Sequence, residues 1–113
     1  MISSSEFIKG YTKIIICSYL YRRRDYLYNI VKKILIDGQG YIRISNPSAL
    51  MVIRELENDN LVSSNIEITE QKQTRKYYEL TDDGKAYYLS NIDDYIKSLH
   101  LLKSMAGGPN RNR

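Results

Sequence analysis

Residues 45–85, SNPSALMVIRELENDNLVSSNIEITEQKQTRKYYELTDDGK, decide the fold of this chain. They begin with a predicted helix in which Asn46 is the cap and Pro47 lies in the first turn, where its missing N–H costs nothing. Apolar residues at helical spacing give this helix one face to bury. They are Ala49, Leu50, Ile53 and Leu56. The helix should end between Asn58 and Asn60, because asparagine tolerates the left-handed backbone conformation that ends helices.

Two half-buried strands are predicted after this helix, because apolar and polar residues alternate imperfectly in both. The apolar members are Val62, Ile66 and Ile68 in the first strand, and Tyr78 and Leu80 in the second. Residues 70–76, EQKQTRK, contain no apolar side chain and should form the exposed tip of a hairpin. A helix followed by such a hairpin has the order of a winged helix, in which the helix enters a DNA groove and the hairpin reaches the backbone beside it. The predicted fold class is therefore an α+β winged helix-turn-helix.

Three more elements are predicted before this stretch. Apolar residues between Phe7 and Tyr21 cover most of a helix circumference, so this helix should be covered on more than one side. Residues 22–25 are predicted to form a turn, and the apolar spacing predicts a second amphipathic helix from Leu27 to Leu35. Residues 41–44, YIRI, are predicted to form one short strand.

The last predicted helix starts at Thr81, whose hydroxyl can cap it ahead of the acidic Asp82 and Asp83. Apolar residues then recur every four and three positions, which is the seam of a coiled coil. We expect this seam to pair with a second copy of the chain, although it could also lie on its own domain. The predicted dimer interface comprises Ile8, Tyr11, Ile15, Tyr88, Ile92, Tyr95, Leu99 and Leu102. The chain thus divides into a winged-helix domain (1–80), a dimerisation helix (81–106) and a disordered tail (107–113).

The composition is that of a folded protein, with 113 residues of which 42% are hydrophobic and 27% are charged. No apolar run approaches the ~20 residues that span a bilayer. The opening MISSSEFIKG lacks the apolar core of a signal peptide, so a cytoplasmic location is expected. A single cysteine, Cys17, cannot form an internal disulfide, and its apolar neighbours favour a buried, inert thiol over a reactive one.

The net charge of +4 is unevenly spread and favours a polyanionic partner. The candidate DNA-binding residues are Asn46, Ser48, Met51, Arg54, Lys72, Arg75 and Lys76. Arg54 has the strongest case, because its guanidinium can fork to guanine or phosphate; a surface ion pair with Glu57 or Asp59 is the alternative. Arg75 and Lys76 are adjacent in a strand and should point to opposite faces, so only one of them should reach a duplex.

The outward face of the predicted recognition helix presents Ser48, Met51, Val52 and Glu55. Ser48 can donate to a phosphate or a base edge, and Met51 can contact a thymine methyl group. The lysines and arginines of the hairpin would contact the DNA backbone without reading sequence. The three arginines at 22–24 lie in a turn and could flank the same site.

Three segments, DYLYNI (25–30), RELENDNLVSS (54–64) and RKYYELTDDG (75–84), resemble the PadR family of bacterial transcriptional regulators, in its small subtype with one C-terminal helix. This resemblance implies a homodimer on pseudo-palindromic operators, usually a repressor released by a small molecule. Here Leu50 stands where the family commonly has tyrosine, Glu55 where it has a basic residue, and Asn60 where it has glycine. The hairpin tip also lacks the family's glycines.

The resemblance also suggests where an effector would bind. Some members of the family bind flat aromatic compounds between paired aromatic side chains at this seam. Tyr95 and its symmetry mate could sandwich such a ligand, with Tyr88 and Ile92 lining the same cavity. The alternative is that Tyr95 only fills the dimer interface.

Catalysis has little support in the sequence. The single histidine, His100, belongs to no cluster with metal-ligand spacing, and no glycine-rich phosphate loop follows a strand. We therefore predict a protein that is not an enzyme and has no metal or cofactor. The alternative function is a winged-helix module that binds a protein partner and does not read DNA, which an acidic Glu55 on the reading face would favour.

Overall fold

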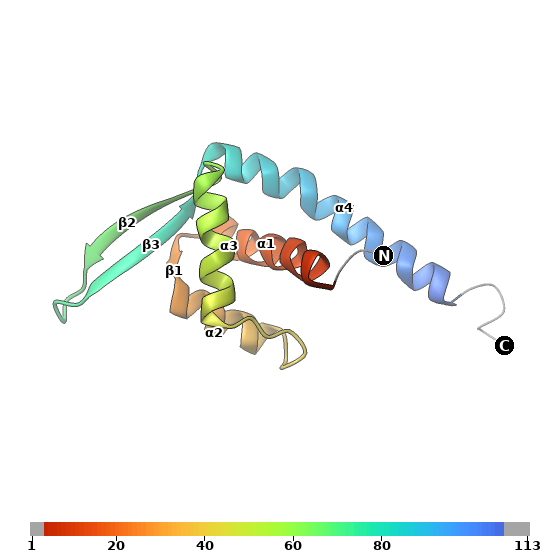
Figure 1. Ribbon diagram of the computed structural model, residues 1–113, viewed down its shortest axis with the longest axis horizontal. Helices are drawn as coiled ribbons and strands as arrows, with labels where there is room; N and C mark the ends of the chain where they lie inside the picture. The colour runs from red at the N-terminus through yellow and green to blue at the C-terminus, as the bar shows by residue number, and fades with distance from the viewer. Residues whose placement is uncertain (1–3, 108–113) are drawn as a thin grey trace.

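The computed structural model describes residues 4–107, with side chains from Lys9 onward. Its elements in chain order are α1 (Ser4–Arg22), β1 (Asp25–Tyr26), α2 (Leu27–Asp37), α3 (Asn46–Asn58), β2 (Val62–Ile68), β3 (Thr74–Leu80) and α4 (Asp82–Gly107). The β2–β3 hairpin, hereafter the wing, projects to one side of the body, and α4 extends to the other (Figure 1). This arrangement is the α+β winged helix-turn-helix that the sequence predicts. The tail beyond residue 107 lies outside the described residues.

The sheet has three antiparallel strands in the order β1-β3-β2. The wing strands pair from Val62 opposite Leu80 at the base to Ile68 opposite Thr74 near the tip. On the other edge of β3, Asp25 pairs with Tyr78. The third strand is therefore β1, which begins at the last residue of the predicted turn.

The strand predicted at residues 41–44 is wrong, because these residues pair with no strand, and it is β1 that pairs with the second edge of β3. Without a strand to pair with, this segment connects α2 to α3 as irregular chain. Its alternation still describes packing, since Ile42 and Ile44 lie against the core whereas Tyr41 is 95% exposed.

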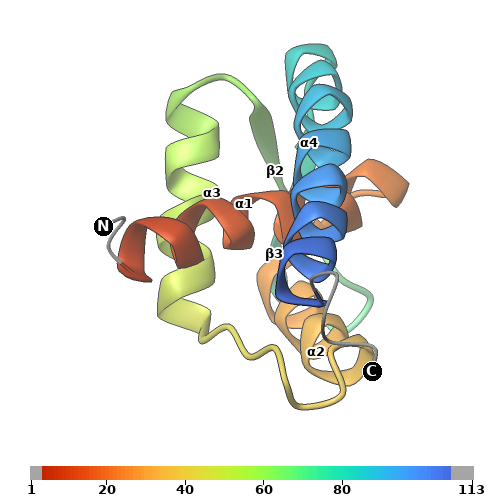
Figure 2. The ribbon, with the colours of Figure 1, turned by 90° about the vertical axis from the view of Figure 1, so that its right-hand side faces the viewer.

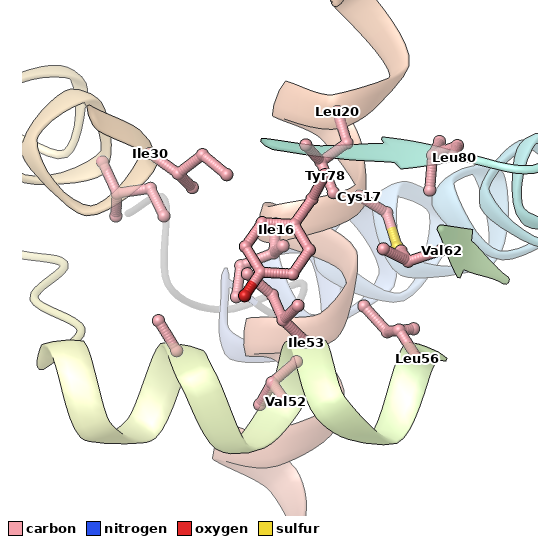
Figure 3. Close-up of a cluster of buried hydrophobic side chains, with 12 residues drawn as sticks. Ile16, Cys17, Leu20, Ile30, Val52, Ile53, Leu56, Val62, Tyr78 and Leu80 are labelled. Atoms are coloured by element: carbon pink, nitrogen blue, oxygen red, sulfur yellow. The ribbon is translucent and has the colours of Figure 1, made fainter. Parts of the chain in front are cut away.

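The core is assembled from every helix of the winged-helix body and from the wing base (Figure 3). α1 lies between α3 and α4 (Figure 2), which explains why its apolar residues cover most of its circumference. The buried cluster comprises Ile16, Cys17, Leu20, Ile30, Ile34, Ala49, Val52, Ile53, Leu56, Val62, Tyr78 and Leu80. The buried position predicted for Cys17 is confirmed, and this burial raises the pKa of its thiol to about 12.

The ends of α3 follow from local chemistry. The cap is Ser45, one residue before the predicted Asn46, because the Ser45 hydroxyl accepts a hydrogen bond from the Ser48 N–H at 3.2 Å. Pro47 lies in the first turn as expected. At the other end, Asn60 has a φ of 60°, which confirms the predicted left-handed residue after the helix.

The start of α4 is joined to the turn after α3 by a set of short contacts. The Thr81 hydroxyl donates to the Asn60 carbonyl at 2.7 Å and accepts from the Gly84 N–H at 3.0 Å. The Thr81 N–H donates to the Leu61 carbonyl, also at 3.0 Å. A Cβ on Gly84 would lie 1.9 Å from that same carbonyl oxygen, so only glycine allows this approach. Thr81 and Gly84 thus form a joint that connects the start of α4 to the turn after α3.

Further along, α4 leaves the body (Figure 1), and the seam residues Leu99 and Leu102 are 52% and 57% exposed. Its exposed large apolar residues include Leu89, Ile96, Leu99, Leu101, Leu102 and Met105. None of the helices described is long and apolar enough to cross a membrane.

Candidate nucleic-acid interface

α3 presents a polar and sulfur-containing face to solvent. Ser48, Met51 and Arg54 are all exposed, and Met51 keeps 58% of its surface. The opposite face is buried in the core through Ala49, Val52, Ile53 and Leu56. The prediction that Val52 belongs to the outward face is therefore wrong, since it is only 4% exposed.

The Arg54 guanidinium is available for a ligand. Among the described residues it forms no ion pair, so the alternative pairing with Glu57 or Asp59 does not occur in the structure. Glu57 instead accepts a hydrogen bond from the Ser64 hydroxyl at 2.9 Å and lies 4.0 Å from the Lys76 ammonium. Arg54 can thus offer its whole fork to guanine or phosphate.

Glu55 does not belong to the outward face, contrary to the prediction. It is half-buried and forms ion pairs with Lys9 at 2.5 Å and Lys13 at 3.5 Å, both on α1. The hydrogen bond from Lys9 and the nearby positive charges hold the pKa of the Glu55 carboxyl below its ordinary value. The acid that replaces a basic residue here is therefore neutralised by lysines of its own chain, and it no longer favours a module that avoids DNA.

The wing ends in a tight, polar tip shorter than predicted. Residues 74–76, assigned to the tip from sequence, belong to β3. The Thr69 N–H donates to the Gln73 carbonyl and the Lys72 N–H donates to the Thr69 carbonyl, each at 2.8 Å. Lys72 itself has a φ of 60°, so a lysine takes the left-handed position that favours glycine. Its side chain is exposed at the end of the hairpin.

The two faces of the wing differ. Lys76 lies on the face toward α3, where it approaches Glu57, while Arg75 lies on the outer face, with its guanidinium 4.3 Å from the centre of the Tyr26 ring. The predicted opposite orientation of these two residues is confirmed. Ile66 lies opposite Lys76 in the register, and Ile66 and Ile68 are 63% and 76% exposed.

The prediction that Ile66 and Ile68 are half-buried is wrong, because the wing extends away from the body (Figure 1) and Val62 at its base is the one buried residue of β2. Sequence reasoning therefore missed two exposed apolar residues beside the basic ones. The sequence did hold a sign of their exposure, because both residues lie close to the polar tip of the hairpin.

The arginines at 22–24 have separate partners. The Arg22 guanidinium lies over the Tyr19 ring at 4.9 Å, and Arg24 pairs with Glu67 of β2 and lies 4.7 Å from the centre of the Tyr77 ring. Arg23 is exposed. These three residues do not form one basic surface with α3.

Comparison with known proteins identifies the family. The sequence pattern of the "Transcriptional regulator PadR-like family" matches residues 16–90, which are most of the chain. The chain belongs to this family. No curated protein sequence matches it significantly.

Solved structures of transcriptional regulators share the fold. A transcriptional regulator from Clostridium thermocellum has 27% identity and a TM-score of 0.77, with 91% of this chain and 96% of that chain covered. A PadR family regulator from Clostridium difficile has 25% identity and a TM-score of 0.73, covering 87% and 100%. Bacillus subtilis PadR in complex with operator DNA has 16% identity and a TM-score of 0.65, covering 81% and 59%, and so shows the fold alone. The protein is thus a PadR-like, DNA-binding transcriptional regulator and not an enzyme.

Of the residues predicted at the dimer interface of this PadR-like chain, those described are either half-buried or exposed. The Tyr88 ring stacks on Tyr21 with centroids 5.0 Å apart, and the Tyr95 hydroxyl lies 2.7 Å from where a Cβ on Gly10 would be. Ile92, Tyr11 and Ile15 are half-buried, whereas Leu99 and Leu102 are 52% and 57% exposed. The Ile8 side chain lies outside the described part of the chain.

The described residues hold no group of three histidine, cysteine, aspartate or glutamate side chains that could bind a metal ion. The most buried charge, Asp25, has a structural role at the start of α2. It accepts hydrogen bonds from the Tyr26 N–H, the Asn29 amide and the Lys33 ammonium, each at 2.8–3.0 Å. Burial alone would raise the pKa of the Asp25 carboxyl, but these three donors lower it below its ordinary value.

Proposed function

We propose that this PadR-like regulator is a homodimeric repressor that binds a pseudo-palindromic operator and is released by a small aromatic ligand. The observation that carries the DNA contact is the exposed face of α3, which presents Met51 together with Arg54, a residue that forms no ion pair within the part of the chain that the structure describes. Ser48 and Asn46 extend this face at the helix N-terminus. Lys76 and Lys72 continue it along the wing, and the neighbouring acid Glu55 is already paired with α1.

The contacts divide into two kinds. Met51 and Arg54 have the position and chemistry to read base edges in the major groove, by a methyl contact and a bidentate fork. The lysines of the wing supply charge that fixes the protein on phosphates without reading sequence. In a dimer, two copies of α3 would enter major grooves about one DNA turn apart.

The open seam of α4 supports the dimer. Leu99 and Leu102 lie three residues apart on one helix and remain about half exposed, as expected of a surface that a second chain covers. The mass in solution tests this directly, with twice the 13.2 kDa chain mass expected for the wild type. Leu99→Glu with Leu102→Glu should give the mass of one chain, whereas the matched control Lys97→Glu should stay dimeric.

Fluorescence anisotropy tests the DNA contact. The labelled duplex carries the sequence upstream of the protein's own gene, and a scrambled duplex of equal length is the control. Preference for the native duplex should survive a rise in salt, although both affinities should fall as counterions are released. Arg54→Ala should weaken native binding at least about tenfold per half-site, and Lys97→Ala on the distant α4 should not. Equal affinity of wild type and Arg54→Ala would exclude α3 as the reading element.

The effector is tested with the same complex. A flat aromatic compound that binds between the paired α4 helices should release the native duplex and leave the scrambled one unaffected. Tyr95→Ala should lose this release, while Tyr41→Ala, at a position that is 95% exposed and remote from the seam, should keep it. A Tyr95→Ala protein that responds like wild type to every inducer would remove Tyr95 from the proposed site.

A further inference from the structure

The outer face of the wing carries a continuous stack of two arginines and two tyrosines. The Arg75 guanidinium lies 4.3 Å from the centre of the Tyr26 ring, and the Tyr26 ring meets Tyr77 edge-on, with centroids 5.6 Å apart and planes at 78°. On the other side of Tyr77, the Arg24 guanidinium lies 4.7 Å from the ring centre. We call Arg75, Tyr26, Tyr77 and Arg24 the wing stack.

The wing stack connects the wing to the body. Arg24 and Tyr26 come from the connection after α1 and from β1, whereas Tyr77 and Arg75 come from β3. The second wing strand joins through Glu67, which accepts two hydrogen bonds from Arg24, one of them 3.2 Å long, and lies opposite Arg75 in the register. Both strands of the wing are therefore tied to the segment between α1 and α2.

On its other face the wing contacts α3 through Glu57, which accepts a hydrogen bond from the Ser64 hydroxyl at 2.9 Å and lies 4.0 Å from the Lys76 ammonium. Past Val62 and Tyr78, the residues that face α3 include the exposed Ile66, Ile68 and Lys76. An isolated two-stranded hairpin is only marginally stable in water, so its direction depends on contacts at its base. The wing stack supplies such contacts on the outer face.

We propose that Arg75 and Arg24 are positioning residues, which set the direction of the wing and leave phosphate contact to Lys72 and Lys76. This inference rests on the proposed DNA contact. Arg75 is half-buried over Tyr26, and the exposed Arg24 is paired with Glu67, so both guanidinium groups already have partners within the chain. Lys72 is exposed at the tip and Lys76 lies on the same side of the wing as α3.

The dependence of DNA affinity on salt separates a phosphate contact from a positioning role. Each phosphate neutralised contributes about 0.9 to the slope of log K against log salt concentration, or about 1.8 for the two wings of a dimer. Arg75→Met removes the charge but keeps an apolar chain on Tyr26, so the slope should stay at the wild-type value. Lys76→Met, next to it on the opposite face, is the matched control and should lower the slope by about 1.8.

Variants of Tyr26 test the stack without removing a charge. Tyr26→Leu should weaken operator binding about tenfold at an unchanged salt slope and lose the DNA footprint beneath the wing, while the footprint beneath α3 persists. Tyr26→Phe keeps the ring and should restore wild-type binding. A slope for Arg75→Met that falls as far as that of Lys76→Met, or a Tyr26→Leu protein with wild-type affinity and footprint, would overturn the proposal.

A measurement without DNA distinguishes failure of this inference from failure of the proposed function. Spin labels on Gln71→Cys at the wing tip and Asn58→Cys at the end of α3 report the direction of the wing, with labelled chains diluted in unlabelled ones. The buried Cys17 should not take up label. The distance distribution should broaden in Tyr26→Leu and remain narrow in Tyr26→Phe. Broadening in a protein that binds no DNA would refute the DNA contact alone, and its absence would refute the positioning role.

Discussion

Gly84→Ala should be a strongly destabilising substitution, although alanine is the better helix former. The added Cβ would lie 1.9 Å from the Leu61 carbonyl oxygen and 2.9 Å from its carbonyl carbon. Both are backbone atoms, so the clash is relieved only if the start of α4 moves away from the turn after α3. That movement would break the hydrogen bonds of Thr81 to Asn60 and Leu61.

The magnitude follows from three contributions. Forced overpacking of a tight contact costs about 1–3 kcal/mol, and loss of a threonine cap costs about 1 kcal/mol. Alanine in place of glycine within a helix recovers about 1 kcal/mol. The sum predicts that Gly84→Ala lowers the free energy of unfolding by about 1–3 kcal/mol.

Equilibrium urea unfolding measures this change, with all variants at one protein concentration because the stability of a dimer depends on it. Gly107→Ala is the matched control, since it lies on the same helix and its Cβ would meet no atom within 4 Å. This control should stay within about 0.5 kcal/mol of wild type. A Gly84→Ala protein at least as stable as wild type would refute the close approach of α4 to Leu61.

Three further predictions concern single side chains. Cys17 should not react with a thiol reagent at about pH 8 until the protein unfolds, because burial raises its pKa to about 12. The pKa of Asp25 is lower in the folded than in the unfolded protein. The ionised Asp25 carboxylate therefore stabilises the fold fully above the ordinary pKa of about 3.9, and this stabilisation is lost as the pH falls through the folded value. The free energy of unfolding, measured as the pH is lowered, should show less of this loss in Asp25→Asn. Glu55→Gln should change DNA affinity less than about threefold, because Lys9 and Lys13 already neutralise the carboxylate at the surface of α1, and a larger gain in anisotropy titrations would return Glu55 to the reading face.

The parts of the fold that the sequence predicts correctly have causes within a few residues. Pro47 in the first turn of α3, Asn60 after its last turn and Thr81 before α4 each act on the neighbouring backbone. The alternation of Arg75 and Lys76 is equally local, because successive residues of a strand point to opposite faces.

One error was avoidable from the sequence. Ala49, Val52, Ile53 and Leu56 have the spacing i, i+3, i+4, i+7, which places all four on one helix face. Giving Leu50 the buried position instead moved Val52 to the outward face, whereas Leu50 is only half-buried in the structure. These four residues define the buried face of α3, and the opposite face is the one that can contact DNA.

The remaining errors come from contacts between distant parts of the chain. No local pattern shows that Glu55 meets Lys9 and Lys13 or that Arg75 lies over Tyr26. The two-residue strand β1 is likewise too short to have a periodicity, and it exists only because β3 offers a free edge. These contacts decide which charges remain available to DNA, so the candidate site cannot be assigned from the sequence alone.

The joint at Thr81 and Gly84 connects the two surfaces that the proposed function requires. It fastens α4 to Asn60 and Leu61, the residues that link the end of α3 to the start of the wing. A 26-residue helix is about 39 Å long, so a small rotation of α4 about this joint displaces its far end by several ångströms. In the proposed dimer the far ends are held by pairing, and the same rotation therefore moves α3 and the wing instead. A ligand between the paired α4 helices would thus change the separation of the two α3 helices. This separation must match the fixed spacing of the two operator half-sites for both helices to bind.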